Sequence, residues 1–276
     1  LGESDWRRWR SYELKLWQSF DRIQVFTGRD QAAIAEMAPA LAERVRVNPF
    51  GIVLPPPADP SLEEAKTLLF VGGFSHQPNV DAACWLGKEI MPLLRVRCPA
   101  VRLLIVGSDP PQEVTALAGE DLLVLGRVPV IEPVVAQAAV VLAPVRIGGG
   151  MRMKVLQGMA LGKPVVTTTR GAEGLLLKQS QRPLVIADSA EAIAEATATL
   201  LASAEARRSL GQRARAFVAE QHSAAAYAGR LAAIAAELPA MIRPASNGQP
   251  PVALASRGRM RPTAGTTAEP GRYEAS

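Results

Sequence analysis

Cysteine and histidine are scarce in this sequence, with two of each among 276 residues. Cys84 and Cys98 have no CxxC spacing, so we predict buried free thiols in a reducing compartment rather than a disulfide framework. No group of His, Cys and Asp has the spacing of metal ligands, so we predict no metal site. Aromatic residues make up only 5% and do not alternate with basic ones, which argues against binding of nucleic acid by base stacking.

Long apolar runs are also missing from the sequence. None reaches the ~18 residues of a membrane span, and no secretory signal opens the chain. Hydrophobic residues still make up 48%, enough for a substantial core in one large or two modest domains. The net charge of +5 favours an anionic substrate or an acidic membrane surface. We therefore expect a cytoplasmic protein, with contact at the inner membrane surface as an alternative.

Apolar residues recur at helical spacing from Trp6 to Phe20, which predicts an amphipathic helix. Trp6, Trp9 and Trp17 on this helix indicate packing against further protein or, alternatively, peripheral contact with a membrane. A short strand over 21–27, a helix over 29–42 and an extended segment over 45–53 are expected next. The proline cluster at 55–60 cannot form regular structure and predicts a domain boundary.

Apolar strands and helices alternate after this boundary. The expected strands are 67–72, 102–107, 122–125, 140–144, 164–168 and 184–187. The expected helices are 79–96, 111–118, 131–138, 152–161, a short one after 168, then 189–203 and 204–221. Each strand is a continuous run of Val, Ile and Leu, so both of its faces should be covered. The pattern predicts an α/β fold with a doubly wound parallel sheet.

A run of glycines and cations stands between two of these strands, in APVRIGGGMRMKVLQGMALGKPVVTTTRGAEG (143–174). Gly148, Gly149 and Gly150 let backbone N–H groups approach a ligand closely, since no Cβ blocks the way. The N-terminus of the following helix attracts anions, and Lys154 adds a cation one turn into it. Arg152 faces either the cleft or the solvent. The segment predicts a phosphate-binding strand, loop and helix.

Other strands also end in glycine. Gly72 and Gly73 predict backbone approach to a pyrophosphate, with a plain turn as the alternative. His76 follows in the same loop, either as a weak phosphate ligand or as a residue that seats the next helix. Asn79 is predicted to cap that helix.

The second and third strands supply weaker candidates. Gly107 lines a nucleotide pocket or forms a turn, and Arg127 contacts phosphate or faces solvent. Arg146 ends a strand, from which it could also face the cleft. Lys163 is expected to extend its ammonium to solvent at the start of a strand.

Five segments together resemble one family. They are FVGGFSHQPNVDAACWLGKEIMPLL, VRLLIVGSDP, VLGRV, LAPVRIGGGMRMKVLQGMALGKPVVTT and RGAEGL. In this order they are similar to the C-terminal, donor-binding domain of family 4 (group 1) glycosyltransferases, over roughly residues 41–227. The resemblance implies a GT-B fold of two Rossmann-like domains. It also implies a nucleoside-diphosphate sugar as donor substrate, retention of anomeric configuration, and no metal or other cofactor.

The resemblance also suggests the domain organisation. Residues 1–54 are expected to be the end of the acceptor-side N-terminal domain with the crossover, and 62–227 the donor-binding Rossmann-like domain. A closing helix at 228–242 and a disordered tail at 243–276, rich in Pro, Gly and Ser, complete the expectation. Most of the first domain is missing and no Met opens the chain, so we expect it to begin inside a longer protein.

Residue roles follow from the same resemblance. Lys154 matches the lysine expected to pair with the donor pyrophosphate and carries the catalytic role. The E-x7-E motif of the family falls on Gly149 and Gln157, and the loss of the second carboxylate implies weaker binding of the ribose hydroxyls. Glu173, in RGAEGL, is expected to contact the donor sugar or to cap a helix.

Two classes of function therefore stay open. The first is a retaining glycosyltransferase, of which this is a partial chain. It would transfer the sugar to an unknown sugar, lipid or small-molecule acceptor. The second is a non-catalytic nucleotide-binding or interaction module, which Gly149 and Gln157 favour. A dinucleotide-dependent oxidoreductase is disfavoured because no GxGxxG opens a helix after the first strand. A nucleotide-sugar epimerase fits the glycine and lysine segment less well.

Overall fold

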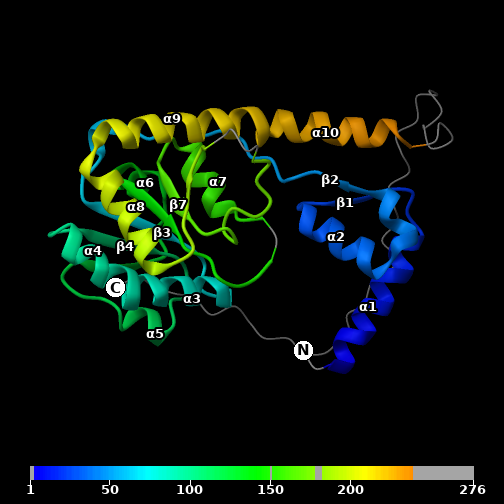
Figure 1. Ribbon diagram of the computed structural model, residues 1–276, viewed down its shortest axis with the longest axis horizontal. Coiled ribbons are helices and arrows are strands. Elements are labelled where there is room, and N and C mark those ends of the chain that lie inside the picture. The colour runs from blue at the N-terminus through cyan, green and yellow to red at the C-terminus, as the bar shows by residue number, and fades with distance from the viewer. Residues whose placement is uncertain (1–2, 150, 178–181, 239–276) are drawn as a thin grey trace, which may run out of the picture. The chain divides into compact units, whose positions relative to one another are not determined.

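A six-stranded parallel sheet forms the centre of the structure, a computed structural model that describes residues 3–149, 151–177 and 182–238 (Figure 1). The strand order is β5-β4-β3-β6-β7-β8. The strands are β3 (Thr67–Val71), β4 (Arg102–Val106), β5 (Leu122–Gly126), β6 (Val140–Ala143), β7 (Val165–Thr167) and β8 (Val185–Ile186). The predicted α/β fold with a doubly wound parallel sheet is confirmed.

Helices cover both faces of this sheet, because alternate residues of each strand point to opposite sides. Leu68 and Phe70 of β3 pack with helices on one face, whereas Leu69 packs with helices on the other. The helices on the first face are α3 (Gln77–Trp85), α4 (Met91–Arg97), α5 (Gln112–Thr115) and α8 (Ala190–Ala202). Those on the second face are α6 (Glu132–Gln137), α7 (Met153–Ala160) and α9 (Ala204–Gln221).

The N-terminal segment builds a smaller core of its own. Its elements are α1 (Glu3–Gln18), β1 (Ile23–Val25), α2 (Gly28–Met37), the 3₁₀ helix η1 (Pro39–Arg44) and β2 (Val45–Val47). Strands β1 and β2 pair in parallel, and Ile23, Ile34, Leu41 and Val45 are buried between them and α2. Trp17 packs against this core, but Trp6 and Trp9 remain more than half exposed on α1. None of the helices among the described residues is both long and apolar enough to cross a membrane.

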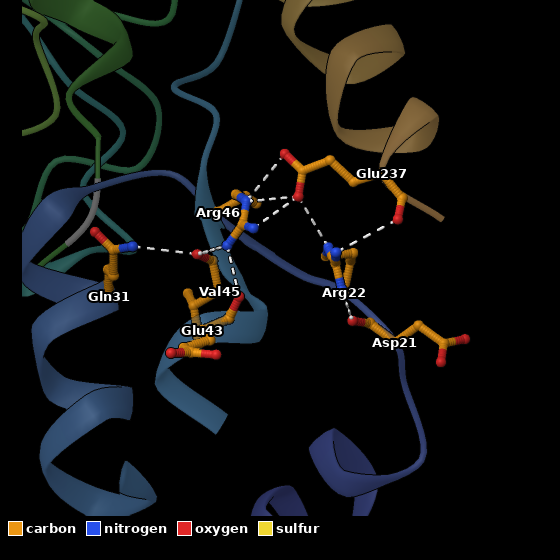
Figure 2. A network of polar contacts seen from close by, with 7 residues as sticks. All are labelled: Asp21, Arg22, Gln31, Glu43, Val45, Arg46 and Glu237. Carbon is orange, nitrogen blue, oxygen red and sulfur yellow. Dashed lines mark hydrogen bonds and ion pairs between the residues drawn. The ribbon is translucent and has the colours of Figure 1, made fainter. Parts of the chain in front are cut away.

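The last of the described helices, α10 (Ala224–Ala236), and the residues beside it hold this N-terminal segment through polar contacts. Figure 2 shows the Glu237 carboxylate between the guanidinium groups of Arg22 and Arg46, with N–O distances of 3.0 and 2.7 Å. Arg230 donates to Asn48 Oδ1 at 2.8 Å. Residues far apart in the sequence therefore meet at this helix, within one compact unit that extends to Leu238.

Several element boundaries differ from the prediction. The helix expected over 79–96 begins at Gln77, and a π-helical turn, η3 (Leu86–Ile90), separates α3 from α4. Residues 169–174 form turns instead of the short helix expected after 168. The closing helix expected at 228–242 begins at Ala224, because the Ser223 hydroxyl accepts a hydrogen bond from Ala226 N–H and caps it. The disordered tail predicted for 243–276 lies outside the described residues.

Another short 3₁₀ helix, η2 (Pro60–Leu62), follows the proline cluster. Asp59 caps it by accepting a hydrogen bond from Ser61 N–H at 2.9 Å. The segment that leads to it pairs with the other end of the chain, since Ile52 forms a parallel bridge with Ser223. The crossover therefore passes beside the junction of α9 and α10 before the sheet begins.

Candidate functional site

A crevice is expected where the direction of the strand order reverses, which in this sheet is between β3 and β6. The chain leaves β3 toward β4 on one side and leaves β6 toward β7 on the other. A cavity of about 530 Å³ lies at these carboxyl ends. Its lining includes nine of the residues singled out in the sequence: Gly72, Gly73, His76, Asn79, Gly148, Gly149, Arg152, Lys154 and Gln157. Gly150, the third glycine of the loop, lies outside the described residues.

Lys154 stands in the first turn of α7 with its ammonium inside the crevice. The ammonium donates a hydrogen bond to Asn79 Oδ1 and lies 4.6 Å from the ring centroid of Phe70. Burial, and secondarily the charge of Arg152, lower the pKa of Lys154 to about 8 from its ordinary 10.5. An ammonium held this way gains from any anion that enters, because an anion would offset its lost hydration.

Glycine is required at two positions of the crevice wall. A Cβ on Gly72 would lie 2.8 Å from Asn79 Cγ and 2.9 Å from Lys154 Nζ. Gly148 has φ +91°, which L side chains rarely adopt, and a Cβ there would lie 2.9 Å from Pro78 Cγ. The two turns therefore bring bare backbone to both sides of the same cavity.

Arg152 shapes the glycine loop from its place just before α7. Its guanidinium donates to Gly149 O at 2.9 Å and to Ile147 O at 3.4 Å. Burial is the main cause that lowers its pKa, while the Glu173 carboxylate opposes the shift. Arg152 also lines the crevice. A second cation thus borders the cavity in addition to Lys154.

Arg146 is not among the described residues that line this cavity. It forms a two-pronged pair with Asp81 on α3, at 3.1 and 2.7 Å, and its guanidinium stacks on Trp85 at 4.6 Å from the ring centroid. The pair ties the loop after β6 to α3. Arg146 thus braces one wall of the crevice from outside.

Three other candidates lie outside the lining that the described residues form. Gly107 packs behind the crevice: a Cβ there would be 1.9 Å from Gly72 O, so this glycine permits the close approach of two turns. Arg127 is exposed beyond β5. Glu173 pairs with Arg29 of α2 at 3.4 Å and with Arg170 at 3.8 Å. Glu173 therefore joins the N-terminal segment to the loop after β7, and it caps none of the helices that the structure describes.

Next to the crevice is a smaller, mainly apolar cavity of about 220 Å³. Ile52, Val53 and Pro55 of the crossover form one side of it, and Ile131 and Val135 near α6 form another. Lys154 and Gln157 border both cavities, and Gln157 is exposed. The crevice therefore offers a polar, cationic surface, and the smaller cavity beside it offers an apolar one.

The sequence did not predict two of the buried polar residues correctly. Asn79 does not cap α3. His76 occupies the cap position, and the buried Asn79 side chain reaches Lys154 and the Gly73 carbonyl instead. Lys163 does not extend into solvent: it is 3% exposed, donates to Ala136 O at 2.8 Å and faces Glu63 at 3.5 Å. The cation that meets Asn79 is 75 positions away and the carboxylate that faces Lys163 is 100 positions away, so no local pattern could have shown either pair.

One protein-family model matches about half of the chain, including the whole sheet. The model for glycosyl transferases group 1 matches residues 65–203, which hold all six strands and the helices from α3 to α8. No curated protein matches the sequence significantly.

Solved glycosyltransferase structures share this GT-B fold. Anabaena HepE, determined with UDP and glucose, is 17% identical with a TM-score of 0.61, over 79% of this chain and 63% of HepE. Sucrose-phosphate synthase from Thermosynechococcus elongatus is 21% identical with a TM-score of 0.62, over 82% and 60%. TarM of S. aureus, in a complex that contains UDP, is 13% identical with a TM-score of 0.67, over 81% and 45%. The chain therefore spans 45–63% of the length of these three proteins, and identities this low concern the fold alone.

Proposed function

The chain belongs to the group 1 glycosyl transferases, and from this premise we propose that its crevice binds the diphosphate of a nucleotide sugar. It would serve as the donor-binding part of a retaining, metal-independent glycosyltransferase. One observation carries the proposal. Two glycine turns and a largely buried ammonium, which has no carboxylate partner among the described residues, meet in one cavity at the point where the strand order reverses.

The chemistry asks this part of the enzyme to stabilise a departing nucleoside diphosphate. Backbone N–H groups at Gly73, Gly148 and Gly149 would donate to phosphate oxygens, since no side chains shield them. The Gly72 N–H already donates to Val106 O at 2.9 Å, so Gly72 contributes close backbone approach instead. The Lys154 ammonium would offset the charge that develops on the leaving group as the bond to the sugar breaks. Arg152 would add a second positive charge while holding the glycine loop.

The nucleoside half of the donor would occupy the apolar cavity. Its position beside the crevice, with Lys154 and Gln157 on the shared border, supports this assignment. The Gln157 amide oxygen would accept from a ribose hydroxyl, more weakly than a carboxylate because the amide is neutral. UDP is present in the HepE and TarM structures, so uridine is the first base to test.

The acceptor would be a sugar, a lipid or a small molecule. The exposed Trp6 and Trp9 of α1 would pack against further protein or contact a membrane surface. An acceptor carried on a lipid would require contact with the membrane. Binding of the donor is the step that the described residues support, so the first experiment addresses the donor.

Thermal shift with UDP-, GDP- and ADP-sugars, followed by calorimetry with the strongest ligand, tests the donor site. Lys154→Ala should weaken binding by about 10- to 100-fold, since a charge-assisted bond contributes about 1.5–3 kcal/mol. Lys88→Ala is the matched control, because Lys88 is exposed on the π-helical turn away from the crevice. Unchanged affinity in Lys154→Ala would reject the assigned site.

A non-catalytic nucleotide-binding module is the second candidate. The observation that favours it is Gln157, which places a neutral amide where the family resemblance implies a carboxylate. Release of UDP from UDP-glucose by the full-length gene product, with and without candidate acceptors, separates the two. Tight binding of nucleotide sugars without any turnover would favour the module.

A further inference from the structure

The Asn79 side chain has two polar partners, one at each end of its amide. Its Nδ2 donates to Gly73 O at 2.6 Å, and its Oδ1 accepts from the Lys154 ammonium. Asn79 is 9% exposed, in the first turn of α3. The partners fix the amide orientation, because only the nitrogen can donate to a carbonyl and only the oxygen can accept from an ammonium.

We propose that Asn79 is a positioning residue that holds the Lys154 ammonium in the crevice with a neutral partner, which leaves its full charge for an anionic ligand. This inference rests on the proposed donor site. The same amide fixes the turn that carries Gly72 and Gly73, so one side chain sets the distance between the backbone donors and the cation. A carboxylate at this position would pair with Lys154 and compete with the diphosphate.

The described groups around Lys154 leave its positive charge unpaired. No ion pair joins Lys154 to a carboxylate within residues 3–149, 151–177 and 182–238. Arg152 on its own element is a like charge, and His76 at the start of α3 lines the same crevice. Glu132 at the start of α6 borders the smaller cavity. Phe70 of β3 offers only its ring face.

The first test needs no ligand. Acylation of Lys154 is followed against pH in the free protein by peptide mapping, with the exposed Lys88 as internal reference. In the natural protein the reactivity should rise around pH 8, because burial lowers the pKa of the Lys154 ammonium to about 8. Asn79→Asp should shift this midpoint upward and lower the Lys154 reactivity at pH 8 by about tenfold, since an adjacent carboxylate favours the charged amine.

Asn48→Asp is the matched control. Asn48 is fully buried and, like Asn79, accepts a hydrogen bond from a cation, Arg230, but it lies outside the crevice lining. It should leave the Lys154 titration unchanged. An unchanged Lys154 midpoint in Asn79→Asp, or an equal shift in Asn48→Asp, would overturn the inference.

The second test uses UDP-glucose in calorimetry at pH 8, in two buffers of different ionisation enthalpy. The natural protein should take up about half a proton per UDP-glucose bound, because a group with a pKa near the pH is half protonated before it meets the diphosphate. In Asn79→Asp, Lys154 should already be protonated, so binding should cause no proton uptake at Lys154. This variant should also bind UDP-glucose at least about tenfold more weakly. Asn79→Ala removes both hydrogen bonds and should also weaken the binding of UDP-glucose. It replaces Asn79→Asp in this test if the Asp variant fails to fold.

The outcomes separate the two proposals. If the natural protein binds no UDP-glucose while Asn79→Asp still shifts the Lys154 midpoint, the contact stands and the proposed donor fails. If UDP-glucose binds equally to the natural protein and to both Asn79 variants, the positioning role is wrong even though the donor site stands.

Discussion

Lys154 is a residue that the folded protein holds at a cost. Its ammonium is largely buried, and the partners described for it are an amide oxygen and an aromatic ring. Its pKa falls from 10.5 to about 8, so the unfolded chain binds this proton more tightly than the folded chain does. The resulting penalty is fully present below pH 8 and disappears above pH 10.5, and it amounts to on the order of 3 kcal/mol.

Lys154→Met should therefore stabilise the ligand-free protein. Methionine removes the buried charge but leaves Asn79 Oδ1 without its donor, which costs about 1 kcal/mol, so a net gain of about 1–2 kcal/mol is expected at pH 7. Urea unfolding at pH 7 measures it. Repeated at pH 10, the gain should shrink, because the natural lysine is by then mostly neutral. A less stable Lys154→Met protein at pH 7 contradicts the argument.

The positions of site residues could be predicted from the sequence where these residues directly follow a strand. Lys154 and the glycines follow strand ends, and parallel strands bring such ends to one edge of the sheet. Prediction failed where the partner is distant. Asp81 pairs with Arg146 across 65 positions, and Glu63 meets Lys163 across 100. A single sequence carries no local trace of such pairs.

The strands could be predicted because each is a continuous apolar run, and all six lie where their sequences indicated. The π-helical turn at Leu86–Ile90 could not, since it adds a residue to a helix without changing its composition. Contacts between elements were equally hidden. Helix α9 approaches the loop before β7 so closely that a Cβ on Gly211 would lie 1.9 Å from Gly162 O.

Gly211→Ala should consequently destabilise the protein by about 2 kcal/mol or more, since rigid backbone on both sides cannot yield. Gly229→Ala in α10 is its matched control. A Cβ there meets nothing within 4 Å, so alanine should stabilise that helix by about 0.5–1 kcal/mol. Thermal unfolding of the two variants measures both effects. If both glycines tolerated alanine equally, the close packing of α9 would be wrong.

At the scale of the whole molecule, the N-terminal segment is held by the end of the described chain. Gln24 donates to the Tyr227 hydroxyl at 3.1 Å, and the carboxylate of Glu237 meets Arg22 and Arg46 (Figure 2). The sequence predicted a crossover near residue 54 but gave no sign of this return, because its partners are about 200 positions apart. The exposed ion pairs add little stability individually. Buried links are better candidates for holding the segments together.

His222 is such a link, fully buried between three parts of the chain. Its Nε2 accepts from Leu176 N–H at 3.3 Å and its Nδ1 faces Phe50 O at 3.3 Å, so the neutral ring joins the crossover, the loop after β7 and the end of α9. Burial lowers the pKa of His222 from 6.5 to about 4, against the pull of the Phe50 carbonyl. The unfolded chain therefore binds more protons between these values, and stability falls as the pH decreases through this window.

The unfolding free energy should accordingly drop by about 2 kcal/mol between pH 7.5 and pH 5 on account of this one ring. Urea unfolding at the two pH values measures the drop. His222→Gln should remove that part of the slope, because glutamine does not titrate. His76→Gln, which changes the exposed second histidine, should keep it. If the unfolding free energy of His222→Gln depended on pH as steeply as that of the natural protein, protonation of His222 would not be the cause of the drop. Carboxylates elsewhere would then account for the acid sensitivity.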